Sequence, residues 1–288
     1  SIVAAFAVPH PPLIIPGVAD DEREQISGTA DAYEEVGRHI ARLKPEAIVI
    51  SSPHAEMYLD YLHISGGVGL GIFARFGAPH ARYSATYDQR FARELCNEAG
   101  RGIAAGTAGE RSPELDHGAM IPPHFVREGW RHAAQEGELS ANTPLPLLVR
   151  MGISDPLPLD HYRLGRAVQR VAGRVGRRVV YIASGDLSHK LKEDRPNGLA
   201  PEGAEFDAST CDAFKTGNFL EFLTMEPGFC ERAAECGLRS FQIMVGVLDA
   251  ARDQQLLSYE GPFGVGYGVA AFTPTGTAGS APERNFGE

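Results

Sequence analysis

Continuously apolar segments of strand length constrain the fold of this chain most strongly. Such segments occupy Ile2–Val8 (IVAAFAV), Ala47–Ser51 (AIVIS) and Arg178–Ser184 (RVVYIAS). A short run that is apolar at nearly every position predicts a strand buried on both faces, and such strands are typical of parallel sheets covered by helices. We therefore expect these segments to form the centre of a covered sheet.

Segments with helical periodicity alternate with these strands. Asp20–Leu43 repeats apolar residues at helical spacing and stops at Lys44-Pro45. A glycine-rich turn is expected at Gly66–Gly71. The alternation predicts an α/β layered fold, with a central largely parallel or mixed sheet flanked by helices. The other expected helices cover residues 88–99, 160–175, 205–216, 219–224, 229–234 and 238–251, and the other expected strands cover 61–65, 145–151, 256–259 and 268–272.

The chain is expected to form one domain over residues 1–273. No linker, composition break or repeat of fixed period divides this part of the sequence. Residues 274–288 are small, polar and proline-bearing, so a disordered tail is expected there.

The charge of the chain limits its expected partners, and its cysteine content limits its expected compartment. The chain has 27 Lys and Arg against 37 Asp and Glu, spread without blocks, so neither nucleic acid nor an anionic membrane is an expected partner. No apolar run approaches the roughly 18 to 20 residues that span a bilayer. The 4 cysteines form no Cys-x-x-Cys pair, which fits a reducing compartment. We expect a cytoplasmic protein.

A histidine follows each of the three apolar strands. These residues are His10, His54 and His189. Ligands of open α/β sheets bind at the carboxyl ends of the strands. Any one of these histidines alone could be a packed structural residue, but three at equivalent positions predict a common site.

The histidines indicate a metal centre. Two imidazoles and one carboxylate, with adjacent positions open, form the ligand set of non-haem Fe(II) oxygenases. The sequence offers two candidates for the carboxylate. Glu56 lies two residues after His54, and Glu235 lies beside small residues at a helix junction.

Short motifs carry a family resemblance across residues 1–273. In order along the chain they are VPHPP (8–12), SPH (52–54), LDHG (115–118), GDLSH (185–189) and AECGLRS (234–240). With these motifs the chain resembles the class III extradiol ring-cleavage dioxygenases, the superfamily of the protocatechuate 4,5-dioxygenase catalytic subunit. Within it, the chain looks most like the Memo-like domain of AmmeMemoRadiSam system proteins.

The resemblance implies a set of site residues. His10, His54 and Glu235 would bind Fe(II), His189 would act as acid and base over the substrate, and His117 would be a second histidine of the pocket. Copper and zinc are alternative metals. The expected substrates are a catechol-type or aminophenol-type ring and O2, and a homodimer is expected by analogy.

The resemblance also leaves an alternative function open. Cys236 stands where Memo proteins present a cysteine to the metal, so Cys236 could be the third ligand in place of Glu235. A thiolate ligand favours soft metals and redox chemistry. The alternative is therefore a Memo-like metal-binding or redox protein without ring cleavage.

Other motifs are incomplete or ambiguous. His54-Ala55-Glu56 matches half of the zinc deaminase signature, but the Pro-Cys-x-x-Cys half is absent. Asp186 could orient a ligand histidine or cap the segment that follows it. The remaining histidines, His39, His80, His124, His132 and His161, are expected to be surface or packing residues.

Overall fold

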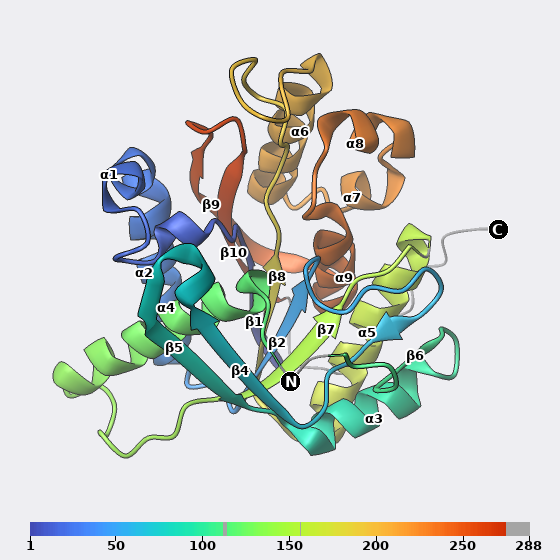
Figure 1. Cartoon of the computed structure of the whole chain (residues 1–288). Coiled ribbons are helices and arrows are strands. Elements are labelled where there is room, and N and C mark those ends of the chain that lie inside the picture. Colours follow the sequence, from blue (N-terminus) through green and yellow to red (C-terminus); the bar gives the residue numbers. More distant parts are fainter. Residues whose placement is uncertain (112–113, 156, 275–288) are drawn as a thin grey trace.

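A six-stranded sheet forms the centre of the computed structural model, which describes residues 1–111, 114–155 and 157–274. The strands run in the order β7-β2-β8-β1-β10-β9 (Figure 1). The first four are parallel, and β10 and β9 are antiparallel to their neighbours. Their bounds are β1 (Ile2–Val8), β2 (Ala47–Ser52), β7 (Leu147–Gly152), β8 (Val179–Ser184), β9 (Ala251–Glu260) and β10 (Tyr267–Pro274).

Helices cover both faces of the sheet, and each face has its own apolar core. Along β1, Ala5 and Ala7 belong to one core, while Ala4 and Phe6 belong to the other. The core containing Phe6 lies under α2 (Ser27–Leu43) and α4 (His117–Gln135). The opposite core lies under α3 (Gln89–Ala99), α5 (Pro158–Arg174), α6 (Pro201–Thr216), α7 (Leu220–Thr224), α8 (Pro227–Ala233) and α9 (Leu238–Leu248).

The α/β layered fold expected from the sequence is confirmed. The helix expected over Asp20–Leu43 is divided into α1 (Asp20–Arg23), a 3-10 turn over Glu24–Ile26, and α2. The helix α4 has no counterpart among the expected elements. Pro122 and Pro123 lie inside it and interrupt the sequence pattern of a helix, because proline lacks the N–H donor.

The glycine-rich turn expected at Gly66–Gly71 is wrong for most of its length. β4 (Val68–Phe73) begins within it and pairs antiparallel with β5 (Ala78–Thr86). The resulting hairpin packs beside α4 (Figure 1). A second small sheet pairs β3 (Leu62–His63) with β6 (Ala105–Gly106). Tertiary pairing therefore overrides the turn propensity of the glycines here.

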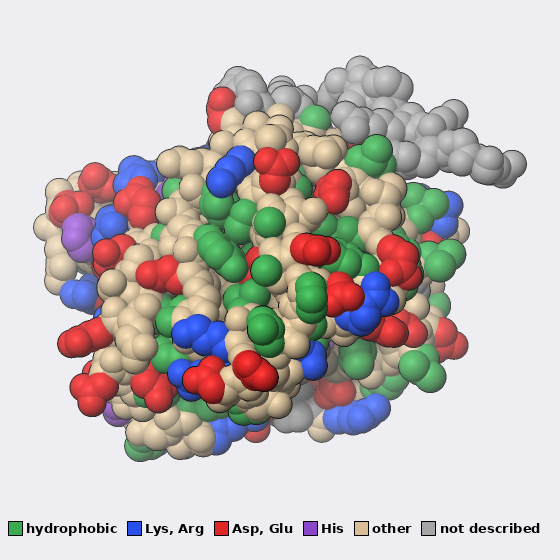
Figure 2. All heavy atoms as spheres, turned by 90° about the horizontal axis from the view of Figure 1, so that it is seen from above, with side chains coloured by type: hydrophobic (Ala, Val, Ile, Leu, Met, Phe, Trp, Pro, Cys, Tyr) green, Lys and Arg blue, Asp and Glu red, His purple; other side chains and the backbone are tan. Residues whose placement is uncertain are grey.

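The C-terminal end and the surface of the described chain do not help to locate a functional site. β10 ends at Pro274, and the expected tail otherwise lies outside the described residues. Across the described part of the chain, no helix combines the length and apolarity needed to cross a bilayer. Seen from above, acidic and basic side chains are interspersed among apolar ones (Figure 2).

The order of the parallel strands places the predicted histidines at one edge. β8 lies between β2 and β1, with Val8 paired to Ser184 and Ser51 paired to Ala183. The carboxyl ends of these three strands therefore lie side by side. The loops that carry His10, His54 and His189 all leave the sheet at this edge.

Candidate functional site

His10 lies at the centre of the site and is 1% exposed. Its main-chain N–H donates to Asp186 Oδ1 at 2.8 Å, and its Nδ1 lies 3.0 Å from Ser184 Oγ. Both contacts come from the end of β8 and the loop that follows. They hold the ring so that Nε2 faces the neighbouring donor atoms, as outer contacts commonly orient a metal-binding histidine.

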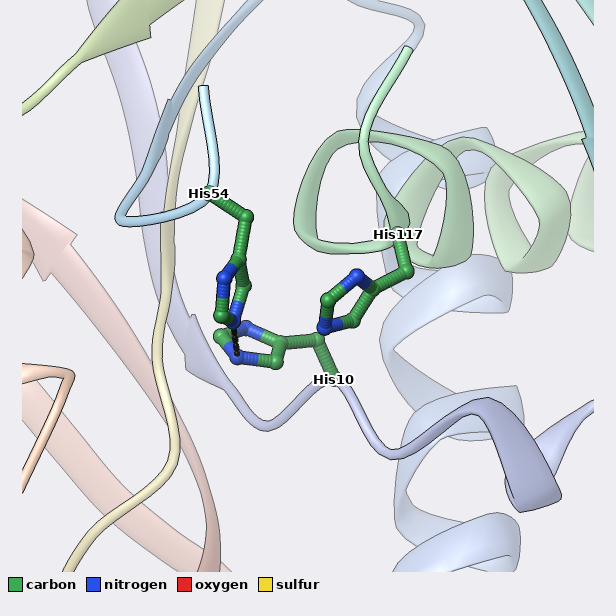
Figure 3. A group of neighbouring side chains, drawn as sticks. All are labelled: His10, His54 and His117. Atoms are coloured by element: carbon green, nitrogen blue, oxygen red, sulfur yellow. Dashed lines mark hydrogen bonds between the residues drawn. The ribbon is translucent and has the colours of Figure 1, made fainter. Parts of the chain in front are cut away.

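His54 and His117 complete a cluster of imidazoles around His10 (Figure 3). The Nε2 atoms of His10 and His54 are 3.1 Å apart. The ring of His117 lies 4.1 Å from that of His54 and 5.2 Å from that of His10, between centroids. His117 is the first residue of α4, whose N-terminus is capped by Asp116. The cap thus fixes where His117 enters the site.

A second group of donor atoms shares His10. Cys236 Sγ lies 3.6 Å from His10 Nε2, and Asp186 Oδ2 lies 3.8 Å from the same nitrogen. The main-chain N–H of Asp186 donates to Cys236 Sγ at 3.3 Å. The donor atoms of His10, Asp186 and Cys236 all lie within 4.8 Å of one another. The structure thus offers a carboxylate and a thiol next to the imidazoles.

Glu235, the carboxylate that the resemblance implies as a ligand, has another contact. Its Oε2 accepts a hydrogen bond from the main-chain N–H of Leu238 at 2.7 Å, at the start of α9. Neither ligand group found among the described residues includes it. Glu56, the other candidate, accepts from the main-chain N–H of Arg111 at 2.9 Å and is also outside both groups.

His189 faces the site from the loop after β8. Its Nδ1 lies 2.7 Å from the main-chain oxygen of Ala234, and its Nε2 lies 3.9 Å from Asp186 Oδ2. Because a carbonyl oxygen only accepts, Nδ1 carries the proton in this contact. In the neutral ring, Nε2 is then the nitrogen that can accept a proton.

Burial determines the protonation of the cluster. Burial, with the nearby His54 and His189, lowers the pKa of His10 well below its usual range, and burial also lowers the pKa of His54. Burial lowers the pKa of His117 to about 3, with His10 and His54 adding to the shift. The rings are therefore neutral near pH 7, which leaves nitrogen lone pairs available for a metal.

The donor set fits a transition metal. Two nitrogens 3.1 Å apart can both lie about 2.1 Å from one ion. His117 adds a third imidazole, with one ring nitrogen within 4.8 Å of those of His10 and His54. Burial raises the pKa of the Asp186 carboxyl and of the Cys236 thiol, so the thiol would release a proton on binding a cation.

A cavity of about 550 Å³ adjoins the imidazole cluster. His54 and His117 line it together with arginines from three separate segments, Arg75, Arg111 and Arg150. These arginines are not among the site residues predicted from the sequence. They come from a 3-10 turn, a loop and β7, and no periodicity or motif in the sequence relates them.

Comparisons with known proteins define the class. A family model described as the catalytic LigB subunit of aromatic ring-opening dioxygenase matches residues 4–270. The chain belongs to this family.

Individual relatives agree with this assignment. The chain is 30% identical to a Clostridium acetobutylicum protein whose name states no activity, over 93% of this chain and 57% of that protein. It is 28% identical to a Pseudomonas 2-aminophenol 1,6-dioxygenase beta subunit, over 81% of this chain and 80% of the subunit. It is also 28% identical to a Rhodococcus 2,3-dihydroxyphenylpropionate/2,3-dihydroxicinnamic acid 1,2-dioxygenase, over 72% of this chain and 66% of that enzyme.

A solved structure shares the fold. The crystal structure of an uncharacterized Escherichia coli K12 protein aligns with a TM-score of 0.55 at 14% identity. The alignment covers 94% of this chain and 99% of the other.

Proposed function

We propose that the chain is an Fe(II)-dependent extradiol dioxygenase that opens a catechol-type or aminophenol-type ring with O2. The observation that carries the proposal is the pair of neutral imidazoles, His10 and His54, at the edge of a 550 Å³ cavity. Relatives named as a dioxygenase subunit for 2-aminophenol and as a dioxygenase for 2,3-dihydroxyphenylpropionate support the substrate class. His10 and His54 would hold the metal.

Three side chains are candidates for the third metal ligand. Glu235 is the candidate implied by the resemblance, and Asp186 and Cys236 have donor atoms nearer to His10. Bound Fe(II) would supply Lewis acidity and a path for electrons between ring and oxygen. The protein would exclude water around His10, orient the substrate in the cavity, and move a proton at His189 Nε2.

The test of this function is anaerobic reconstitution of the purified chain with Fe(II), followed by oxygen uptake and absorbance scans with catechols and 2-aminophenols. We expect stoichiometric oxygen consumption and a coloured ring-opened product. Iron binding without oxygen consumption for any ring would contradict the proposal.

His189→Ala is expected to separate turnover from metal binding. A general acid and base contributes typically 10²- to 10⁴-fold, and His189 contacts Ala234 and Asp186 rather than belonging to either ligand group. We therefore expect kcat to fall by about 10²- to 10⁴-fold while metal content stays unchanged. Measurement of kcat and metal content on the same preparation checks this, and wild-type turnover would refute the role of His189.

A second candidate function is a Memo-like metal-binding or redox protein without ring cleavage. The observation that favours it is the 3.6 Å distance between Cys236 Sγ and His10 Nε2, because a thiolate ligand suits soft and redox-active metals. For this function, copper should bind more tightly than Fe(II), and no diol or aminophenol should stimulate oxygen uptake.

Matched variants identify the third ligand. Glu235→Gln keeps an oxygen that can accept from Leu238 N–H, and Cys236→Ser keeps the size of the side chain. If Cys236 is the third ligand, as the second candidate function requires, Glu235→Gln should weaken metal binding less than Cys236→Ser does, because the Glu235 carboxylate is held at α9. Equilibrium competition with a chromophoric chelator measures both affinities. The reverse order would make Glu235 the ligand.

The proposal extends to assembly and compartment. A homodimer in the cytoplasm is the expected form, and the beta-subunit name of the Pseudomonas relative makes a further subunit a second possibility. The chain spans 57% of the length of the Clostridium relative, so an added domain could contribute to activity there. Light scattering of the purified chain tests the dimer.

A further inference from the structure

Two of the three arginines in the cavity are already neutralised. Arg150 is 2% exposed, and its guanidinium donates to Glu110 at 2.9 Å and to Ser65 Oγ at 2.8 Å. Arg111 Nε lies 3.6 Å from Glu56 Oε2, and its guanidinium lies over the Tyr58 ring. These contacts indicate structural roles for both charges.

Arg75 differs from both. Its guanidinium carbon lies 4.8 Å from the centroid of the Phe76 ring. Within the described part of the chain, no carboxylate forms an ion pair with Arg75. The Arg75 side chain is solvent-exposed and lines the same cavity as His54 and His117. Arg75 is therefore a cation of the cavity that forms no ion pair among the described residues, although the carboxylates of Glu114 and Asp116 line the same cavity.

Phe76 connects this cation to the imidazole cluster. Its ring lies 5.7 Å from that of His117, between centroids, in an edge-to-face arrangement. Phe76 does not line the cavity itself; it packs against His117 on one side and Arg75 on the other. The cavity thus presents the imidazoles of His54 and His117 and, beside them, the guanidinium of Arg75.

We propose that Arg75 determines substrate specificity by binding a carboxylate substituent of the aromatic substrate. The inference rests on the proposed function for the orientation of the ring, while the preference for an anion rests on the cavity itself. A guanidinium matches a carboxylate through two parallel hydrogen bonds. One free cation suits a monoanion, because the other two arginines are paired with Glu56 and Glu110.

The negative charge of the whole chain makes a local cation more important for an anionic substrate. With a formal net charge of −10, the protein repels anions in general, so an anionic substrate needs a local cation. Arg75 supplies that cation in the cavity.

The binding test uses phenylacetate and its neutral isostere phenylacetamide with the purified full chain, followed by ligand-observed NMR titration. A charge-assisted bidentate contact at an exposed site is worth roughly tenfold in affinity, so we expect wild type to prefer phenylacetate by that factor. Arg75→Gln should reduce the preference to about twofold or less. Arg75→Lys should retain part of it, because lysine keeps the charge but not the planar fork.

Arg111→Gln is the matched control. It removes a cation from the same cavity, but one that is already paired with Glu56, so the preference for phenylacetate should persist. The inference is overturned if wild type does not distinguish the two ligands, or if Arg75→Gln keeps the full preference.

A turnover test separates this inference from the proposed function. With iron-loaded protein, Arg75→Gln should raise KM for 3,4-dihydroxyphenylacetate and leave kcat nearly unchanged. The lost contact to the carboxylate would stabilise the bound substrate and the transition state equally. The KM for 3,4-dihydroxyphenylacetamide should not change. Equal kcat/KM for both diols in wild type would overturn the role of Arg75 and leave ring opening intact. Absence of ring opening with an Arg75-dependent preference for phenylacetate would overturn only the proposed function.

Discussion

Substitution of His10 by alanine is expected to abolish high-affinity metal binding. His10 is the one residue shared by both ligand groups of the described chain. Loss of an outer contact to a metal ligand typically costs 10- to 100-fold in affinity, so loss of this ligand should cost more than about 100-fold. The measurement is metal content after anaerobic loading and desalting, with affinity from chelator competition.

Two further variants make the His10 result interpretable. His10 is buried, so its removal also perturbs packing. His54→Ala removes a more exposed histidine of the proposed metal site and should give a similar loss of metal with less effect on folding. His132→Ala is the negative control, because His132 lies on α4 beside Glu136, outside both ligand groups. Wild-type affinity in His10→Ala would rule out a metal centre at this cluster.

Substitution of Gly246 by alanine is expected to lower the free energy of unfolding by about 1–3 kcal/mol. A Cβ atom at Gly246 in α9 would overlap the main-chain oxygen of Tyr162 in α5, and a Cβ at Gly165 in α5 would overlap that of Ile243 in α9. A main-chain oxygen cannot rotate away from the added Cβ atom as the end of a flexible side chain could. The two helices would have to separate, and overpacking of this kind costs typically 1–3 kcal/mol.

Urea denaturation measures the effect, and Gly173→Ala provides the control. Gly173 lies in α5 as well, but nothing lies within 4 Å of a Cβ built there. In a helix, alanine is favoured over glycine by roughly 0.5–1 kcal/mol, so Gly173→Ala should be slightly stabilising. An unchanged urea midpoint in Gly246→Ala would show that α5 and α9 can separate at little cost.

The parts of the site that the sequence predicted are those that depend on strand ends. An apolar run such as Ile2–Val8 identifies a strand by itself, and the residue after it must lie at an edge of the sheet. His10 and His54 therefore meet as expected, with Nε2 atoms 3.1 Å apart. His189 reaches the same edge because it follows β8, on the loop that also carries Asp186.

The identity of the third ligand could not be predicted from the sequence. The position of the Glu235 carboxylate depends on the start of α9, where Leu238 N–H competes for it. Cys236 approaches His10 because the turn before it takes a left-handed conformation at Ala234. The Glu235 contact is local, but a hydrogen bond to a backbone N–H is available to any nearby carboxylate, so the sequence does not show which one makes it. The Cys236 contact joins residues 226 apart and has no local signal.

By itself, the amino-acid sequence determined the layered fold and the gathering of histidines at one sheet edge, because periodicity and strand ends are local properties of the chain. Only the tertiary structure decided that α4 carries His117 into the cluster and that the β4–β5 hairpin and its 3-10 turn bring Arg75 to the cavity. Those placements depend on the packing of segments far apart in sequence, where long-range contacts override local propensity.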